Sequence, residues 1–430
     1  MAIWNPGMEC ASQGDMEKIQ LERLKHTVRA AYDHVPMYRA KMDKAGVKPS
    51  DIQSLKDIGK IPLTGKAELR EQYPFKLLAV PMRQVVRIHA SSGTTGQPIT
   101  AGYTRGDLEM WAENIARLAT AGGVTQDDIA QVSFGYTLFT GAFGLHGGLE
   151  RIGAAIIPIS SGNTERQVQI MRDFGATALI ATPSYALYLA EVAEKMDALK
   201  DIRLRVGLFG AEASTEEMRA ELERRFHILA TENYGLTEVL GPGVAGECEC
   251  KCGMHINVDH FLPEIIDPDT QEPLPLGEQG ELVLTTLTKE AQPALRYRTR
   301  DITRLIPEPC ACGRTQLRME KVKGRSDDML IIRGVNVFPS QIESVLVGQK
   351  GIGPHYEIVV SRSNYVDHLQ VKVELVDAGL LDRYSELEAL HNKIRSELRT
   401  VLQLDAEVTL VSPYTLKRFE GKAKRVTDLR

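Results

Sequence analysis

Long apolar runs are missing from this 430-residue sequence. No stretch approaches the roughly 18 apolar residues that a membrane helix needs. The start, MAIWNPGMECASQGDMEKIQ, lacks the basic flank and apolar core of a secretory signal. An excess of positive charge is missing too, because 52 Lys and Arg stand against 57 Asp and Glu, a net charge of −5. The sequence therefore predicts neither a membrane nor a nucleic-acid partner.

Cysteine is scarce as well, with six residues in the whole chain. This number is too small for a disulfide scaffold, and a reducing cytoplasm is the simplest predicted location. A hydrophobic content of 43% with 25% charged residues is ordinary for a globular protein. The length allows two or three domains with a large buried core.

Hydrophobic periodicity divides the chain into four regions. Residues 15–45 have the pattern of an amphipathic helix that Pro36 breaks. From Ile88 on, short β-rich runs alternate with helical patterns, which predicts βαβ units and a largely parallel sheet. The runs are DIAQVSF, AAIIPIS, ATALIATP, LRVGLFG and HILATENYG, with helices such as ERQVQIMRDF and TEEMRAELERRF between them.

After Asn257 the pattern changes to turns and isolated strands, which favours an antiparallel or barrel-like region. A smaller α+β unit of about a hundred residues follows. Its predicted strands are YEIVVSR, HLQVKVELV and AEVTLV, and its predicted helices lie near PSQIESVLV and YSELEALHNKIRSELRTVL.

A polar, glycine-containing stretch, SSGTTGQP, lies between an apparent strand (VVRIHA) and an apparent helix (GDLEMWAENIARLA). Gly93 and Gly96 let the backbone approach a ligand, and the loop amides could form an anion-binding nest. Gln97 and Pro98 follow where a P-loop needs Lys and Ser or Thr, which disfavours a Walker-type NTPase. The loop alone leaves a surface turn and a phosphate site equally open.

Three later segments carry residues suited to a nucleotide. NYGLTE, Asn233 to Glu238, puts an aromatic ring, a hydroxyl and a carboxylate at the end of a predicted strand, where α/β proteins bind ligands. Such a carboxylate could hold Mg²⁺. In RYRTRDITRL, Asp301 could accept hydrogen bonds from ribose hydroxyls, the alternative being a surface ion pair. GRSDDMLIIRGVNVFPSQIE stands at the predicted domain boundary.

SSGTTGQP, YGLTE, YRTRD, GRSDDMLIIRGVNVFPSQIE and GKAKRV occur in the order seen in adenylate-forming acyl-CoA synthetases. The sequences of these motifs most resemble those of the phenylacetate–CoA ligase branch, and the resemblance covers essentially the whole chain. The resemblance implies an α/β fold with a large N-terminal adenylation domain of layered sheets and helices, residues 1–326. A small mobile α+β domain, residues 327–430, would act as a lid.

The resemblance also implies a two-step reaction. A carboxylate attacks the α-phosphorus of ATP to give an acyl adenylate and pyrophosphate, and the CoA thiol then displaces AMP. Such chemistry depends mainly on positioning and on electrostatic relief of charge. Residues implied to bind the nucleotide and its phosphates are Ser91, Ser92, Gly93, Thr94, Thr95, Gly96, Gly210, Ala211, Glu212, Asn233, Tyr234, Gly235, Thr237, Asp301 and Arg325. Among them, Tyr234 would stack on adenine, Thr237 would bond a phosphate, and Asp301 and Arg325 would hold the ribose; Glu238 would bind Mg²⁺.

Three further residues have roles that only the resemblance implies. Lys422 resembles the family's mobile lysine, which stabilises charge at the α-phosphate; a solvated basic tail is the alternative. With Thr237 and Glu238 it completes the predicted catalytic set. Asp327 resembles the hinge of the lid, and it could at the same time cap a turn. Lys66 in IPLTGKAELR could reach the ATP phosphates or be a helix-surface lysine.

SFGYTLFTGAFGLHGG is rich in aromatic residues and glycine, which suits the wall of a pocket for a flat acyl group. The predicted wall is Tyr136, Phe139 and Phe143, with Ala211 and Gly235 as a floor of small residues. Plain core packing is the alternative for an aromatic cluster.

Five cysteines fall in two short segments, GECECKCGMHINVDH and PCACG. A tight Cys/His group and a distant Cys-x-Cys suit a closed, tetrahedral zinc site of structural type. The resemblance implies Cys248, His255, Cys310 and Cys312 as ligands. Cys250 and Cys252 leave the choice among the first three cysteines open, and buried thiols without metal are the alternative.

The sequence therefore predicts a ligase that uses ATP, Mg²⁺ and CoA on an aryl acid such as phenylacetate. One rival is an adenylyltransferase of the same branch that acts on a deazaflavin without CoA, and another is a non-catalytic nucleotide-binding homologue. Relatives are often homodimers, so a homodimer is also an expectation. Which acid is used is not readable from these residues.

Overall fold

The N-terminal helices are separated by Pro36, whose fixed φ and missing N–H suit the first turn of a helix and not its interior. In the computed structural model, α2 (Gln13–His34) begins after Ser12, whose hydroxyl accepts a hydrogen bond from the Asp15 amide, and α3 (Pro36–Lys44) starts at the proline. The predicted break is confirmed.

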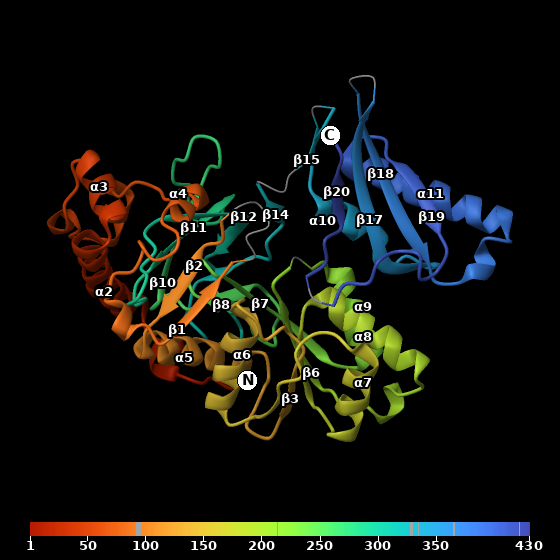
Figure 1. Ribbon diagram of the computed structural model, residues 1–430, viewed down its shortest axis with the longest axis horizontal. Helices are drawn as coiled ribbons and strands as arrows, with labels where there is room; N and C mark the ends of the chain where they lie inside the picture. Colours follow the sequence, from red (N-terminus) through yellow and green to blue (C-terminus); the bar gives the residue numbers. More distant parts are fainter. Residues whose placement is uncertain (92–96, 213, 327–329, 334, 364–365, 421) are drawn as a thin grey trace.

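The structure describes residues 1–91, 97–212, 214–326, 330–333, 335–363, 366–420 and 422–430. They form a large body and a smaller C-terminal lobe beside it (Figure 1). The other helices are α1 (Pro6–Glu9), α4 (Lys66–Glu71), α5 (Arg105–Ala121), α6 (Gly141–Ile152), α7 (Thr164–Asp173), α8 (Pro183–Lys195), α9 (Glu216–Phe226), α10 (Pro339–Leu346) and α11 (Tyr384–Leu402).

Parallel strands form the centre of the body. They are β3 (Ile129–Val132), β4 (Ala155–Ile157), β5 (Ala178–Ala181), β6 (Val206–Gly210) and β7 (Leu229–Leu236), in the spatial order β7-β6-β5-β3-β4. Side chains of β5 alternate between two cores, because successive residues of a strand point to opposite faces. Ile180 packs in the core that includes α5 and α6, whereas Leu179 packs in the core of α7, α8 and α9. The predicted parallel sheet is confirmed.

Antiparallel strands continue this sheet beyond β7. They are β8 (Gly241–Glu247), β9 (Met254–Ile256), β10 (Phe261–Ile266), β11 (Gln279–Thr286), β12 (Tyr297–Ile306), β13 (Arg318–Met319) and β14 (Gly324–Arg325). Antiparallel pairing after Asn257 was predicted and is found. It belongs to one 12-stranded sheet of the described residues, because β8 pairs with both β7 and β9.

The glycine-containing stretch joins two strands of a hairpin. β1 (Arg87–Ala90) pairs antiparallel with β2 (Thr100–Tyr103), and α5 begins only at Arg105. The expected strand and helix are both present, but β2 lies between them. Ser91 anchors the near end of the loop, since its hydroxyl accepts a hydrogen bond from the Ile99 amide at 2.9 Å.

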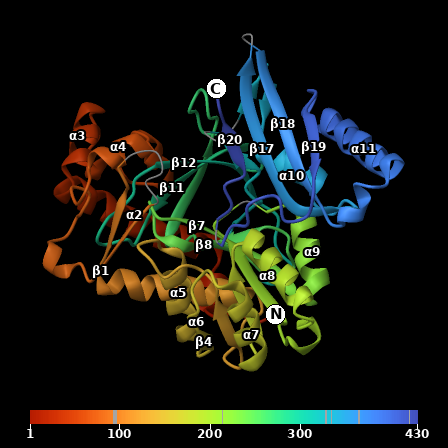
Figure 2. The same ribbon diagram turned by 45° about the vertical axis from the view of Figure 1, so that its right-hand side comes forward.

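The C-terminal lobe has a core of its own. Its sheet has the order β19-β18-β17-β20, with α10 and α11 packed against it (Figure 2). The strands are β17 (Ile352–Ser363), β18 (Val366–Leu375), β19 (Glu407–Val411) and β20 (Val426–Asp428), beside a hairpin of β15 (Leu330–Ile332) and β16 (Val335–Val337). The predicted α+β unit is confirmed, while the boundary at 326/327 stays a prediction.

No helix of the described residues is both long and apolar enough to cross a bilayer.

The contact between α5 and α6 generates a stability prediction. A Cβ on Gly148 would lie 2.2 Å from the Cβ of Ile115, whereas a Cβ on Gly147 would meet Ala112 at an ordinary 3.9 Å. We expect Gly148→Ala to lower the free energy of unfolding by about 1–3 kcal/mol through overpacking. Gly147→Ala on the same helix should raise it by about 0.5–1 kcal/mol. Urea unfolding measures both, and equal effects would contradict this packing.

Candidate active site

Neighbouring parallel strands end together at the edge of the sheet where ligands bind in open α/β folds. The side-chain amide of Asn233, on β7, donates to the backbone oxygen of Phe209 on β6 at 2.8 Å. Gly210 ends β6, and a Cβ there would lie 2.5 Å from the Asn233 oxygen. Ala211 then adopts φ 70°, a left-handed conformation that is rare and costly outside glycine. Such strain is typical of functional sites.

Tyr234, Asp301 and Arg325 form one polar group at this edge. The Tyr234 hydroxyl donates to Asp301 Oδ2 at 2.5 Å, and Arg325 Nη1 donates to Oδ1 at 3.1 Å. Burial raises the pKa of Tyr234 well above its ordinary value, and the Asp301 charge adds to the rise, so the phenol stays protonated. Asp301 pairs directly with Arg325 across β12 and β14. It is buried, which excludes the surface-ion-pair alternative.

The end of the YGLTE stretch is held by two neighbouring segments. Thr237 Oγ1 lies 3.2 Å from the Oγ1 of Thr140, the residue that precedes α6. Glu238 is buried and forms an ion pair with Lys66 at 3.2 Å. Lys66 is the first residue of α4 and is not an isolated surface lysine. The structure thus brings Lys66, Thr237 and Glu238 together.

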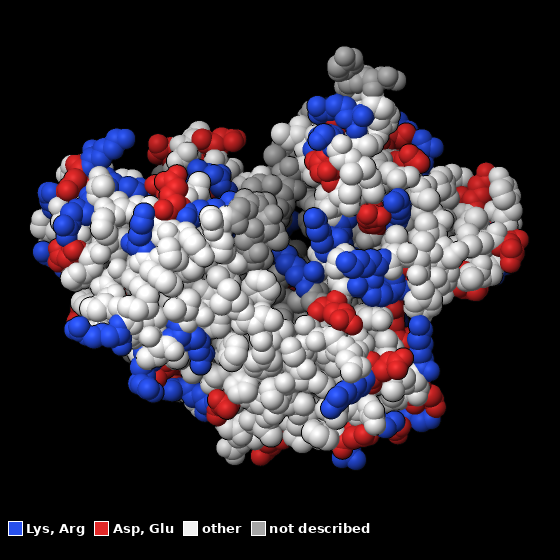
Figure 3. Space-filling model, in the orientation of Figure 1, with Lys and Arg blue, Asp and Glu red and all other residues white. Residues whose placement is uncertain are grey.

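Glu212 connects the edge of the sheet to the tail of the chain. Its Oε1 accepts hydrogen bonds from the Ser184 amide at 2.7 Å and hydroxyl at 2.5 Å, and its Oε2 accepts from the Ala423 amide at 3.0 Å. Lys422 is exposed next to this contact. The predicted lysine thus lies beside the edge of the sheet where β6 and β7 end, which is the predicted nucleotide edge. Lys and Arg side chains gather around the hollow between the lobes (Figure 3), which would attract an anionic nucleotide.

Aromatic side chains line the start of α6. The Tyr136 and Phe143 rings meet edge to face with centres 5.2 Å apart, and the Tyr136 hydroxyl lies 2.9 Å from His146 Nδ1. Phe139 is 49% exposed and stands apart from that pair. For Gly235, a Cβ would lie 1.9 Å from the Gly241 oxygen, so the approach of β8 already demands glycine there.

Sequence reasoning missed a buried histidine behind this wall. His89 on β1 contacts the rings of Tyr103, Trp111 and Phe143. Its Nδ1 lies 3.1 Å from the Leu138 oxygen, and burial lowers its pKa, so the ring is neutral. A single histidine in an apolar strand is usually interpreted as a core residue. The one signal in the sequence is its position just before the SSGTTGQP loop.

Two sets of predicted residues lie outside the described part of the chain. These are the phosphate-loop residues Ser92, Gly93, Thr94, Thr95 and Gly96, and the hinge residue Asp327. Their roles stay predictions.

Four ligand-type side chains converge where β8, β9 and the PCACG loop meet. Donor atoms of Cys248, His255, Cys310 and Cys312 all lie within 4.8 Å of one another, and all four residues are buried. The Cys248 and Cys310 sulfurs are 3.7 Å apart, and Cys312 Sγ is 3.4 Å from His255 Nε2. A tetrahedron with Zn–S of about 2.3 Å and Zn–N of about 2.0 Å has edges of about 3.8 and 3.5 Å. The donor set therefore fits a four-coordinate ion.

The pKa shifts of His255 and Cys310 suit metal binding, whereas burial raises the pKa of the Cys248 thiol. Burial lowers the pKa of His255 to about 3, which leaves a neutral imidazole. Burial raises the pKa of the Cys310 thiol, but hydrogen bonds from Cys312, Cys252 and Cys248 outweigh it and lower the value to about 7. A neutral imidazole and an accessible thiolate are the forms that bind metal.

The other cysteines and His260 stand outside this group of four. Cys252 is exposed, and its sulfur lies 3.4 Å from Cys310 Sγ and 3.0 Å from Arg318 Nη1. Cys250 contacts the Met1 sulfur at 3.6 Å. His260 Nδ1 lies 2.7 Å from the Thr288 hydroxyl. The geometry thus favours Cys248 as the first ligand.

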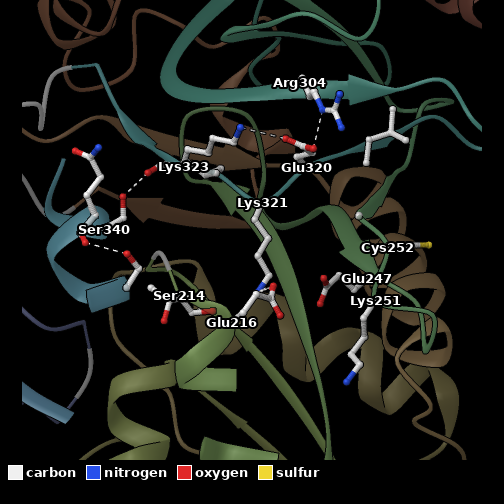
Figure 4. Close-up of a pocket in the computed structure, with 16 residues that line it drawn as sticks. Ser214, Glu216, Glu247, Lys251, Cys252, Arg304, Glu320, Lys321, Lys323 and Ser340 are labelled. Carbon is white, nitrogen blue, oxygen red and sulfur yellow. Dashed lines mark hydrogen bonds and ion pairs between the residues drawn. The ribbon is translucent and has the colours of Figure 1, made fainter. Parts of the chain in front are cut away.

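A second hollow lies beside α10, and Ser340, Gln341 and Ser344 of this helix line it. This cleft of ≈ 690 Å³ is lined by charged residues from α9, the end of β8 and the β13–β14 segment (Figure 4). The charges pair with one another: Lys321 lies 2.8 Å from Glu216, and Arg304 lies 2.6 Å from Glu320. Among the described residues, none of those predicted to bind the nucleotide lines this cleft.

Comparison with known proteins decides the family. Residues 15–287 match the AMP-binding enzymes, and residues 334–430 match the C-terminal domain of AMP-binding enzymes. The chain belongs to the AMP-binding enzyme family. It is an adenylate-forming acyl-CoA ligase, as the resemblance predicted.

This AMP-binding enzyme is similar over its full length to named relatives. It is 49% identical to the phenylacetate–coenzyme A ligase of Escherichia coli, over 98% of this chain and 97% of the other. It is 44% identical to the enzyme of that name from Thermus thermophilus, with 100% of both chains covered.

Solved structures distinguish two arrangements of the lobes. A 2-hydroxyisobutyryl-CoA ligase in the postadenylation state is 30% identical and superposes with a TM-score of 0.93, over 99% of this chain and 92% of the other. The same ligase in the thioesterification state gives 0.72, over 98% and 91%. The lobes of the present AMP-binding enzyme therefore lie as in the first state.

The cysteine geometry generates a metal prediction. We expect protein purified without chelator to hold about one zinc per chain, and Cys312→Ser to lose most of it because one of four ligands is gone. Elemental analysis measures the content. Cys250→Ser is the matched control and should keep the metal, since its sulfur lies outside the group of four. Wild-type protein with less than about 0.2 zinc per chain would contradict the site.

Proposed function

We propose that this enzyme converts phenylacetate, or an arylacetic acid of similar shape, to its CoA thioester, with ATP cleaved to AMP and pyrophosphate. The observation that carries the aryl part is the edge-to-face pair of Tyr136 and Phe143. Phe143 lies one helical turn after Thr140, which contacts Thr237 of the YGLTE stretch. Flat apolar walls thus stand next to the nucleotide edge. The names of the four full-length relatives support the same acid.

The first step is attack of a substrate carboxylate oxygen on the α-phosphorus, with pyrophosphate as the leaving group. Negative charge builds on the phosphoryl oxygens, and fixed donors and cations lower its energy. In our proposal Thr237 donates a hydroxyl there, and Lys422 brings an ammonium from the tail that the Ala423 amide docks on Glu212. Lys66 would turn from Glu238 toward the phosphates.

Asp301 would position the ribose. An ionised carboxylate has about four lone-pair positions, and Tyr234 and Arg325 supply donors to its two oxygens. A carboxylate that is fixed in this way at the sheet edge suits contact with ribose hydroxyls. Tyr234 would present its ring face to adenine while its hydroxyl keeps the carboxylate fixed.

Two metals belong to the proposal. The buried Glu238 carboxylate is a hard oxygen ligand suited to Mg²⁺, which neutralises phosphate charge when bound. Zn²⁺ is the ion we assign to Cys248, His255, Cys310 and Cys312. Four protein ligands leave it no open position, so it would clamp β8, β9 and the PCACG loop without taking part in the chemistry.

In the second step the CoA sulfur attacks the acyl carbonyl carbon and AMP leaves. A location in a reducing cytoplasm suits this thiol chemistry and the six cysteines, none of which forms a disulfide in the described residues. A homodimer stays a prediction from the resemblance.

Substitution of the tail lysine tests the first step. We expect Lys422→Ala to lose acid-dependent ATP–pyrophosphate exchange by about 10²-fold or more, because a charge-stabilising donor is removed. Thioester formation from supplied acyl adenylate and CoA should survive. Lys424→Ala, two residues on and also exposed, is the control and should keep both half-reactions. Equal survival of both half-reactions in Lys422→Ala would refute the role.

A panel of acids tests the substrate. Exchange with phenylacetate should exceed exchange with benzoate or hexanoate by about tenfold or more, since one methylene in a fitted apolar pocket is worth about 10–200-fold. AMP should then form only when CoA is added. Adenylyl transfer to a deazaflavin without acid or CoA would favour the rival enzyme, and no response to ATP would favour the non-catalytic homologue.

A further inference from the structure

Helix α8 presents two charged residues to the C-terminal lobe. Glu191 and Lys195 are four residues apart, so they share one face of the helix. Glu191 Oε1 accepts a hydrogen bond from His355 Nε2, on β17, at 2.8 Å. Its Oε2 lies 3.5 Å from Arg418 Nε, and Lys195 Nζ lies 3.5 Å from the centre of the Tyr414 ring. One turn of α8 thus contacts the other lobe at three points.

The segment that α8 contacts is itself a fixed part of the C-terminal lobe. Arg418 donates twice to the buried Glu374 carboxylate, at 2.5 and 2.8 Å. The amides of Tyr414 and Leu416 donate to the same carboxylate at 2.8 and 3.1 Å. Residues 414–418 therefore move with β18, and Lys422 follows four residues later. We infer that a contact at Arg418 influences the position of this lysine because the two residues are so close in sequence.

We propose that Glu191, supported by Lys195, is a positioning residue for the first half-reaction. It holds the anchored 414–418 segment against α8, so that the tail reaches Glu212 and Lys422 stands at the nucleotide edge. The proposal rests on the role proposed above for Lys422. Glu191 would touch neither ATP nor the acid and would act only through the position of the lobe.

The geometry of this contact also suits release. Within the described residues, neither Glu191 Oε2 nor Arg418 Nε has a hydrogen-bond partner. Their 3.5 Å separation exceeds the 2.7–3.2 Å of an N–H···O bond. The pair attracts through charge alone, without the directional bonds that Arg418 makes to Glu374. The lobe can therefore leave α8 while the 414–418 segment stays intact.

The test compares the two half-reactions in Glu191→Gln and Glu191→Ala. We expect acid-dependent ATP–pyrophosphate exchange to fall about tenfold, as coupling between sites commonly does. Thioester formation from supplied acyl adenylate and CoA should stay the same or become faster. Lys195→Ala should show the same direction with a smaller change. Glu194→Gln is the matched control on α8, because Glu194 faces Arg225 of its own lobe at 3.5 Å.

A second measurement follows the distance between the two lobes. Fluorophores on unnatural amino acids at the exposed Arg166 and Asn392, one in each lobe, report their separation by energy transfer. The distance distribution should shift or broaden in Glu191→Gln and not in Glu194→Gln. An unchanged distribution, or an equal fall of both half-reactions, would overturn the proposal. Wild-type protein without any acid-dependent exchange would instead refute the proposed function, and the distance readout would still decide the role of Glu191.

Discussion

The Glu212 carboxylate is the interaction on which the arrangement of the site depends. One oxygen holds Ser184 at the start of α8, and the other holds the Ala423 amide of the tail. Glu212 reaches both because Ala211 turns the chain through a left-handed conformation directly after β6. The strain at Ala211 is therefore tied to a side chain that joins the sheet edge to the second lobe. Without that turn, the backbone at Glu212 would continue in the direction of β6.

Much of the fold was readable because long segments keep one hydrophobic period. The alternation that predicted a parallel sheet reappears in the two cores on either side of β5. β2 was missed because TAGY is four residues long and shows no period. The joining of β10, β11 and β12 to the rest of the sheet was not predictable either. It depends on β13 pairing with β9, more than sixty residues earlier, and such pairing leaves no mark in local sequence.

The candidate site, like the fold, was predictable only in part. Residue types at the sheet edge followed from strand ends, but the bond between Tyr234 and Asp301 joins positions 67 residues apart. Only the resemblance to a family predicted that both residues bind the same nucleotide. The cysteine group was visible as two clusters, whereas the choice of Cys248 over its neighbours required distances. The PCACG loop has a second anchor that no motif announced: buried Arg314 pairs with buried Glu9 of the N-terminal helix at 2.5 Å. Such a pair is costly to break, so this loop is fixed from both sides.

The 2-hydroxyisobutyryl-CoA ligase has two lobe arrangements, and such an enzyme needs an interface that is specific and yet separable. The contacts found here meet that need by their chemistry. Glu191 contacts His355 and Arg418 across the boundary, and Lys195 and Glu212 make one polar contact each. Among the described residues, Val347 is the one C-terminal-lobe side chain in the apolar core that α7, α8 and α9 share. Polar contacts fix the angle of the lobe, because they require particular partners, while little apolar area must return to water when it leaves. The apolar area that resists unfolding stays within each lobe, so motion between the lobes need not weaken either core.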